Sequence, residues 1–191
     1  MKKLLFVNCC IRSDSRTEKL ARGYLNSLSG EYDIHELNVP DLDILPFDEC
    51  ALDQRNSDAA CDDFSGETYA LAHQFADADR IVIAAPYWDC LFPAKLKVYL
   101  EHICVCGITF AYDQTGKPVK FCRADTLVYI TTAGGYLAKP SGLQVYLTEL
   151  CTLFSIENFL FYAAEALDIF PEKCSDSLNN TLLQIYADEN R

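Results

Sequence analysis

Ile81-Val82-Ile83-Ala84-Ala85-Pro86 is the clearest strand signal in this sequence. Five apolar residues follow one another without polar alternation, as is typical of a strand buried on both faces of a parallel sheet. Pro86 cannot donate to a sheet ladder, so it ends the strand. The stretch therefore predicts a central strand of an α/β domain, with its carboxyl end opening into the segment after Pro86.

The segments on either side of this strand alternate between two periodicities. Four further short runs predict strands: residues 4–7, 32–37, 127–131 and 159–162. Apolar residues at helical spacing, in two cases behind a capping serine, predict helices in five segments: residues 15–30, 69–76, 93–103, 141 onward and 175–187. Strands that alternate with helices form a parallel sheet with helices on both faces. We expect residues 1–191 to form one three-layer α/β domain, a doubly wound parallel five-stranded sheet.

Two segments depart from this alternation. Residues 38–65 are rich in acidic residues and contain two prolines and few periodic apolar positions. We expect them to form an acidic surface excursion. Residues 109–122 have strand-like residues on both sides of Gln114-Thr115-Gly116-Lys117-Pro118, a turn-forming sequence that predicts a β-hairpin excursion.

Charge is distributed unevenly along the chain. The 16 Lys and Arg against 28 Asp and Glu give a formal net charge of −12. Residues 31–79 hold fourteen acidic residues and one arginine, whereas residues 1–22 hold six basic and two acidic residues, a net charge of +4. This balance argues against nucleic acid as a partner, and no apolar run reaches the ~18 residues that a membrane span needs. An anionic ligand would need a locally positive binding site, and the basic amino-terminal segment could supply one.

Ten cysteines are many for a chain of this length. No secretory signal is recognisable before them, and they form no C-x-x-C pair. The three histidines lack the spacing of zinc ligands. We therefore expect a cytoplasmic protein with reduced cysteines and no metal site.

The segment Cys9-Cys10-Ile11-Arg12-Ser13-Asp14-Ser15-Arg16-Thr17 joins the first strand to a capped helix. Ligands of doubly wound sheets bind beyond the carboxyl ends of the strands. The amides and dipole of a helix N-terminus attract phosphate, and hydroxyls and arginines add donors and charge. Neither a dinucleotide fingerprint nor a Walker lysine is present. The alternative is that Ser15 only caps the helix and the arginines are solvated.

Two further strand ends have unusual compositions. Ala85-Pro86-Tyr87-Trp88-Asp89-Cys90-Leu91-Phe92-Pro93 places three aromatic residues in a loop, where they suit either a flat ring system or a hydrophobic contact. Thr132-Ala133-Gly134-Gly135-Tyr136 contains two glycines that would let a ligand approach the backbone closely. A phosphate site, an aromatic loop and a glycine loop at three strand ends together predict a phosphorylated planar cofactor, flavin mononucleotide (FMN).

One long block of the sequence resembles a known family. Ala85-Pro86-Tyr87-Trp88-Asp89, then Pro93-Ala94-Lys95-Leu96-Lys97-Val98-Tyr99 and Gly107-Ile108-Thr109-Phe110-Ala111-Tyr112, strongly resemble the FMN-dependent NADH:quinone oxidoreductases and azoreductases. The correspondence extends nearly from the first strand to the fifth. It implies a flavodoxin-like fold and a homodimer with bound FMN. It also implies a ping-pong reaction, in which NADH or NADPH reduces the flavin and a quinone, azo compound or similar small acceptor takes two electrons.

The resemblance also implies which residues form the site. The residues that match the phosphate site are Cys9, Ser15, Arg16 and Thr17. Those that match the loop along the isoalloxazine ring are Pro86, Tyr87, Trp88 and Asp89. Those that match the loop at the pyrimidine edge are Thr132, Ala133, Gly134 and Gly135. The expected substrate-pocket residues are Trp88, Tyr136 and Tyr112, of which Tyr112 matches an aromatic that lines the pocket in the family's homodimers.

Some positions depart from the family pattern, and no catalytic residue is assigned. Cys9 stands where serine is common, and Asp89 stands where many members have asparagine. Ala133 and Leu137 stand where some members have arginine and histidine, so the resemblance indicates no proton donor. Tyr136 is a candidate for that role, and the alternative is that it only forms a wall of the pocket.

Two other functions are open at this point. A flavodoxin-type electron shuttle or a flavin-binding regulatory protein could use the acidic segment to meet protein partners. The spacing of Cys10, five residues and Arg16 also matches the skeleton of low-molecular-weight tyrosine phosphatases and arsenate reductases, whose chemistry needs a thiolate in an amide cradle.

Overall fold

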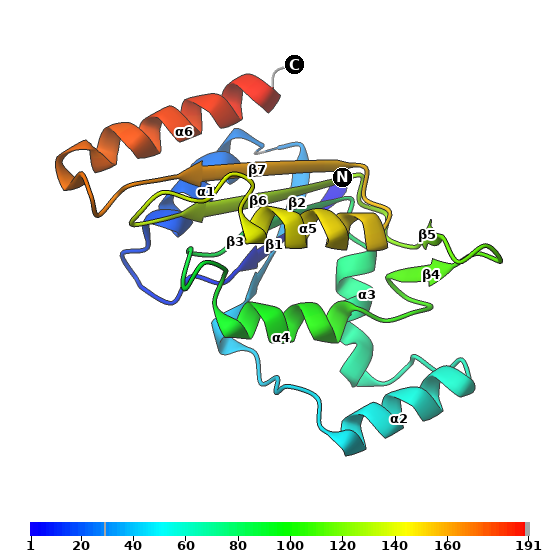
Figure 1. The fold of residues 1–191 in the computed structure, drawn as a ribbon. Helices are drawn as coiled ribbons and strands as arrows, with labels where there is room; N and C mark the ends of the chain where they lie inside the picture. The colour runs from blue at the N-terminus through cyan, green and yellow to red at the C-terminus, as the bar shows by residue number, and fades with distance from the viewer. Residues whose placement is uncertain (29, 190–191) are drawn as a thin grey trace.

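The computed structural model describes residues 1–28 and 30–189, and Figure 1 shows its elements. A parallel sheet has the strand order β2-β1-β3-β6-β7. Its strands are β1 (Lys2–Asn8), β2 (Tyr32–Asn38), β3 (Arg80–Ala84), β6 (Thr126–Thr132) and β7 (Asn158–Ala164). The helices are α1 (Arg16–Ser27), α2 (Glu49–Ala60), α3 (Ala70–Ala76), α4 (Ala94–Ile103), α5 (Gly142–Leu153) and α6 (Cys174–Glu189). Short 3₁₀ turns are η1 (Val39–Asp41), η2 (Glu67–Tyr69) and η3 (Pro171–Lys173). The predicted doubly wound five-stranded parallel sheet is confirmed.

Alternate residues of β3 pack into two different cores. Ile81 and Ile83 belong to the core that holds residues of α3, α4 and α5, whereas Val82 and Ala84 belong to the core that holds residues of α1 and α6. All four side chains are fully buried. This two-sided burial explains why the strand is apolar throughout. Figure 1 shows α6 on one side of the sheet, and α4 and α5 on the other.

The strand order reverses between β1 and β3, the position where doubly wound sheets bind ligands. The chain goes from β1 outward to β2, then crosses back to β3 on the other side of β1. The loops that follow β1, β3 and β6 therefore open at one edge of the sheet. In Figure 1 this is the left-hand edge, toward which the arrowheads of β6 and β7 point.

The acidic segment 38–65 contains a helix that the sequence analysis did not predict. Helix α2 is capped by Asp48, whose Oδ1 accepts a hydrogen bond from the Ala51 amide at 2.8 Å. None of its residues is buried, so the sequence has no apolar residues at helical spacing that would indicate this helix. Arg55 joins it to the end of α4, because its guanidinium donates to the carbonyls of Glu101 and Cys104. The segment was predicted as a surface excursion, and α2 is a helix within it that the sequence pattern did not indicate.

The hairpin predicted within 109–122 is present. Strand β4 (Phe110–Tyr112) pairs antiparallel with β5 (Pro118–Lys120), and the two form a separate sheet. Figure 1 shows this hairpin at the end of the molecule opposite to the carboxyl ends of the parallel strands. Within the described residues, no helix is long and apolar enough to cross a membrane.

Candidate functional site

The three predicted loops meet around one cavity of about 420 Å³. This volume lies within the range of roughly 300–1,000 Å³ found for small-molecule sites. The lining residues are Ile11, Arg12, Asp14, Ser15, Arg16, Thr17, Lys19, Pro86, Tyr87, Trp88, Thr132, Gly134 and Asp168. The cavity thus lies at the carboxyl ends of β1, β3 and β6, as the fold class predicts.

The first turn of α1 presents free donors to this cavity. Ser15 is the N-cap, and its Oγ accepts a hydrogen bond from the Glu18 amide at 3.2 Å. Across the described residues, the amides of Arg16 and Thr17 have no acceptor in the protein. Such amides at a helix N-terminus, together with the helix dipole, bind an anion. These amides lie where the sequence predicts a phosphate site.

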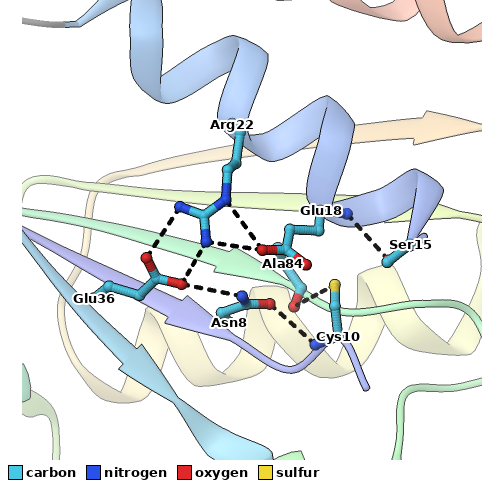
Figure 2. Close-up of polar contacts among 7 residues, drawn as sticks. All are labelled: Asn8, Cys10, Ser15, Glu18, Arg22, Glu36 and Ala84. Atoms are coloured by element: carbon cyan, nitrogen blue, oxygen red, sulfur yellow. Dashed lines mark hydrogen bonds and ion pairs between the residues drawn. The ribbon is translucent and has the colours of Figure 1, made fainter. Parts of the chain in front are cut away.

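Figure 2 shows the polar network that holds the start of the phosphate loop (residues 9–17). Asn8 accepts a hydrogen bond from the Cys10 amide at 3.0 Å and donates one to Glu36 on β2 at 3.2 Å. Glu36 also accepts two hydrogen bonds from Arg22, at 2.8 and 3.0 Å. The Arg22 guanidinium holds the pKa of the Glu36 carboxyl below its usual value. The loop is therefore tied to α1 and β2 before any ligand binds.

Arg22 also neutralises an acid close to the predicted phosphate site. It donates two hydrogen bonds to the Glu18 carboxylate, at 2.8 and 3.0 Å. Glu18 is in the first turn of α1. Because its charge is paired with Arg22, it repels an anion at the helix N-terminus less than a free carboxylate would.

The guanidinium of Arg16 is already paired. Its Nη2 donates to Asp168 Oδ1 at 2.8 Å, and its Nη1 donates to the Leu167 carbonyl at 3.4 Å. The hydrogen bond to Asp168 raises the pKa of Arg16 further above its ordinary value. The side chain therefore points toward Asp168 in the loop after β7, which also lines the cavity.

The aromatic loop makes a tight turn beside the cavity. The backbone groups of Trp88 and Leu91 bond each other at 2.8 and 3.2 Å. The two residues between them, Asp89 and Cys90, have φ values of +48° and +67°, the left-handed conformation of a two-residue hairpin turn. Tyr87 is tied to the glycine loop, since its amide donates to the Thr132 carbonyl at 3.1 Å. The Trp88 side chain is exposed at the rim of the site.

The glycine loop is joined along its length to the loop after β7. The amides of Ala166, Leu167 and Asp168 donate to the carbonyls of residues 135, 133 and 134, at 2.8, 3.1 and 3.0 Å. A Cβ atom at Gly134 would lie 2.2 Å from Asp168 Oδ2, so a side chain there would displace the carboxylate. This close approach explains the glycine at position 134.

Eight of the predicted residues line the cavity: Ser15, Arg16, Thr17, Pro86, Tyr87, Trp88, Thr132 and Gly134. Cys9, Asp89, Ala133 and Gly135 belong to the same loops but do not line it. Cys9 is 1 % exposed and packs in the core with Leu5 and Val7. The alternation along β1 already indicates this inward direction, because residues 5, 7 and 9 share a face. For all twelve residues, binding to FMN stays a prediction.

The two tyrosines of the expected substrate pocket lie outside the cavity of one chain. Tyr136 directly follows the glycine loop and is 68 % exposed. Tyr112 is in β4, on the hairpin at the opposite end of the molecule (Figure 1). Its predicted role requires a second subunit, so it stays a prediction about the homodimer.

Five lining residues were not among the predicted site residues: Ile11, Arg12, Asp14, Lys19 and Asp168. Lys19 lies one helical turn after Ser15, a spacing that could have indicated its position. Asp168 had no local signal, because it lies 34 residues after Gly134 and reaches the cavity only through the pairing of β7 with β6.

The geometry argues against the phosphatase chemistry. Burial raises the pKa of the Cys10 thiol to about 11, and its Sγ lies 3.8 Å from the Ala84 carbonyl (Figure 2). A nucleophilic cysteine needs the opposite, a lowered pKa. The arginine that would bind the oxyanion in a phosphatase, Arg16, is paired with Asp168.

Across the described residues, no group of three or more His, Cys, Asp or Glu side chains could hold a metal ion.

The chain matches known proteins over most of its length. A family model described as "Flavodoxin-like fold" matches residues 2–187. An "FMN-dependent NADH:quinone oxidoreductase 2" from Clostridium perfringens is 33% identical over 178 residues, with 88% of each chain covered. The chain belongs to this flavodoxin-like family of FMN-dependent NADH:quinone oxidoreductases. A relative of the same description from Clostridium acetobutylicum is 40% identical over 116 residues, a match that spans 58% of each chain.

Solved structures support the same fold for this family member. An azoreductase from Bacillus anthracis str. Sterne superposes with a TM-score of 0.83 at 21% identity, covering 97% of each chain. An FMN-dependent NADH-azoreductase from Bacillus anthracis str. Ames Ancestor, in complex with FMN, gives 0.76 at 19% identity, covering 98% of this chain and 99% of that one.

Proposed function

We propose that this protein binds FMN and passes two electrons from NADH or NADPH to a quinone, an azo compound or a similar small acceptor. The observation that carries this proposal is the single cavity in which the free amides of α1, the aromatic loop and the glycine loop converge. The names of the relatives, FMN-dependent NADH:quinone oxidoreductase and azoreductase, support the same chemistry.

The residues of the cavity fit the parts of FMN. The amides of Arg16 and Thr17 suit the phosphate, and the Ser15 hydroxyl adds a polar partner. Tyr87 and Trp88 offer flat apolar surface to the isoalloxazine ring. The backbone of Thr132 and Gly134 can approach the pyrimidine edge closely because position 134 has no side chain. Bound FMN would supply the redox chemistry, accepting a hydride and then releasing two electrons.

The protein's own contribution is to bind and orient the reactants. The hydrogen bonds that join the three loops fix the cradle before a ligand enters. The exposed Trp88 leaves one side of the site open. On that side a nicotinamide and then an electron acceptor would bind in turn, as a ping-pong reaction requires.

A homodimer would close the open side. We assign this role to Tyr112 of the partner subunit and to Tyr136, which follows the glycine loop. Both side chains are large, aromatic and exposed in one chain, at 54 % and 68 %. We also place the protein in the cytoplasm, because all ten of its cysteines are free thiols, as expected in a reducing compartment.

Visible spectroscopy of the purified protein tests the proposal. We expect the protein to bind FMN stoichiometrically and quench its fluorescence. Under anaerobic conditions, NADH or NADPH should bleach the flavin band, and a quinone should restore it. A preparation that cannot be loaded with FMN would refute the proposal. If FMN binds but neither NADH nor NADPH bleaches it, the protein would instead be an electron shuttle or a flavin-binding regulator.

A further inference from the structure

Asp168 brings a negative charge to the phosphate end of the cavity. It lines the cavity together with Asp14, whereas Arg12, Arg16 and Lys19 supply positive charge. Its carboxylate lies against the Arg16 guanidinium at 2.8 Å. A phosphate group placed at the α1 amides would therefore meet an arginine whose charge is already balanced.

The backbone of Asp168 is held in place by hydrogen bonds other than the ion pair. Its amide donates to the Gly134 carbonyl at 3.0 Å, and the amide of Leu167 donates to the Ala133 carbonyl at 3.1 Å. Gly134 leaves the space that the carboxylate occupies, since a Cβ atom there would lie 2.2 Å from Oδ2. The backbone of the loop after β7 thus delivers this carboxylate to the cavity.

We propose that Asp168 lowers and so sets the affinity of the site for the cofactor phosphate, because it competes with that phosphate for the Arg16 guanidinium. This inference rests on the proposed FMN site. It adds a residue that determines how strongly the site distinguishes phosphorylated from unphosphorylated flavin.

The sign of the effect follows from charge. A phosphate monoester carries about −1.5 to −2 charges at neutral pH, so a carboxylate beside it is repulsive. A guanidinium binds phosphate best with two parallel hydrogen bonds, and Asp168 occupies one of its nitrogens. The pair is partly exposed, with side chains 36% and 69% accessible, so the effect is moderate.

Asp168→Asn is the informative substitution. Asparagine has nearly the same shape as aspartate but no charge. The backbone hydrogen bond from residue 168 to the Gly134 carbonyl is unaffected, and the side-chain oxygen can still accept a hydrogen bond from Arg16. We expect FMN to bind about fivefold more tightly, equivalent to about 1 kcal/mol. Riboflavin lacks the phosphate, so its affinity should not change. A role of Asp168 in loop structure alone would alter both affinities together.

The experiment measures quenching of flavin fluorescence by the protein, with FMN and with riboflavin. Asp176→Asn is the matched control, because Asp176 is exposed on α6 and changes the net charge equally without lining the cavity. A second background, Arg16→Gln, removes the group for which the two anions compete. There, Asp168→Asn should strengthen FMN binding by a smaller factor than in the wild-type background.

Selective tightening of FMN in Asp168→Asn, absent in Asp176→Asn, supports the inference. An unchanged or weaker FMN affinity, a parallel change for riboflavin, or an equal gain in Asp176→Asn overturns it. If the wild-type protein binds neither flavin, the proposed function fails, and inorganic phosphate becomes the probe. A larger thermal stabilisation by phosphate in Asp168→Asn than in wild type would then support the inference, and an equal one would overturn it.

Discussion

The hydroxyl oxygens of Thr17 and Thr132 lie 2.6 Å apart in the buried floor of the cavity. Their side chains belong to the first turn of α1 and the last residue of β6, which are 115 residues apart in the chain. The two residues are 1 % and 8 % exposed. This hydrogen bond fixes the distance between the predicted phosphate loop and the glycine loop in the absence of a ligand.

Thr17→Val and Thr132→Val should each destabilise the protein by about 1–3 kcal/mol, because each leaves the other buried hydroxyl without its partner. The double substitution removes both polar groups and should cost less than the sum of the two. Urea unfolding of the flavin-free protein measures all three. Thr148→Val, on the exposed face of α5, serves as the control for the threonine-to-valine change. Strict additivity of the two costs would contradict this prediction.

Gly134→Ala should destabilise the flavin-free protein by about 1 kcal/mol, whereas Gly135→Ala should cost less. The new methyl group at position 134 meets the Asp168 carboxylate, while nothing lies within 4 Å of a Cβ atom at position 135. The carboxylate would have to move away and leave Arg16 unpaired. Thermal unfolding of the two variants measures the difference.

A second background, Asp168→Ala, tests whether the clash with the Asp168 carboxylate causes this loss of stability. Asp168→Ala removes the atoms that a methyl group at Gly134 would meet most closely, leaving a Cβ at 3.3 Å. In that background, Gly134→Ala should cost less than in the wild-type background. Equal costs in both would show that the backbone, not the Asp168 side chain, is what excludes a larger residue.

Much of the fold was predictable because the central strand β3 is apolar on both faces and helices α1 and α5 begin at recognisable caps. The apolar run at residues 81–85 indicates a buried strand without information from any other part of the chain. Ser15 and Ser141 both act as N-caps, and Ser141 forms the complete capping box with Gln144. These signals are local, so one sequence is enough to detect them.

The features that the sequence did not reveal depend on contacts between distant segments. Helix α2 has no buried residue, so no apolar periodicity marks it, and Arg55 joins it to α4. Asp168 enters the site only because β7 lies beside β6. The pairing of Arg16 with Asp168 is invisible in the sequence for the same reason.

Glu36→Gln should lower stability at neutral pH by about 1 kcal/mol or less, because the ion pair with Arg22 is partly exposed. The pKa of Glu36 is lowered in the folded protein, chiefly by hydrogen bonds from Arg22. Its stabilising contribution is therefore complete above the unfolded value of about 4.3 and is lost as the pH falls through the lower folded value.

Urea unfolding at neutral pH and at about pH 3 measures this contribution. The stability difference between wild type and Glu36→Gln should be present at neutral pH and shrink in acid. Glu31→Gln, at the exposed turn before β2, controls for the loss of a carboxylate elsewhere. A difference that is the same at both pH values would mean that the Glu36→Gln variant loses packing or hydrogen bonds rather than charge.

Cys9 and Cys10 should resist alkylation by iodoacetamide at about pH 8, at which a thiolate is the reacting species. Burial raises the pKa of the Cys9 thiol to about 12 and that of Cys10 to about 11. The exposed cysteines should react first; they are Cys50, Cys61, Cys90 and Cys106. Peptide mapping by mass spectrometry after short labelling times gives the order of reaction.

Labelling of Cys10, combined with a Cys10→Ser variant, distinguishes a flavin site from a thiol nucleophile at the end of β1. If the Cys10 side chain has only a packing role, Cys10→Ser should bind FMN with an affinity within about threefold of wild type and should hydrolyse no aryl phosphate. A phosphatase would behave in the opposite way, because its thiolate would be the fastest group to alkylate and serine would abolish its activity. Rapid labelling of Cys10, together with aryl phosphate hydrolysis that the serine variant loses, would therefore assign the phosphate loop to covalent catalysis instead of cofactor binding.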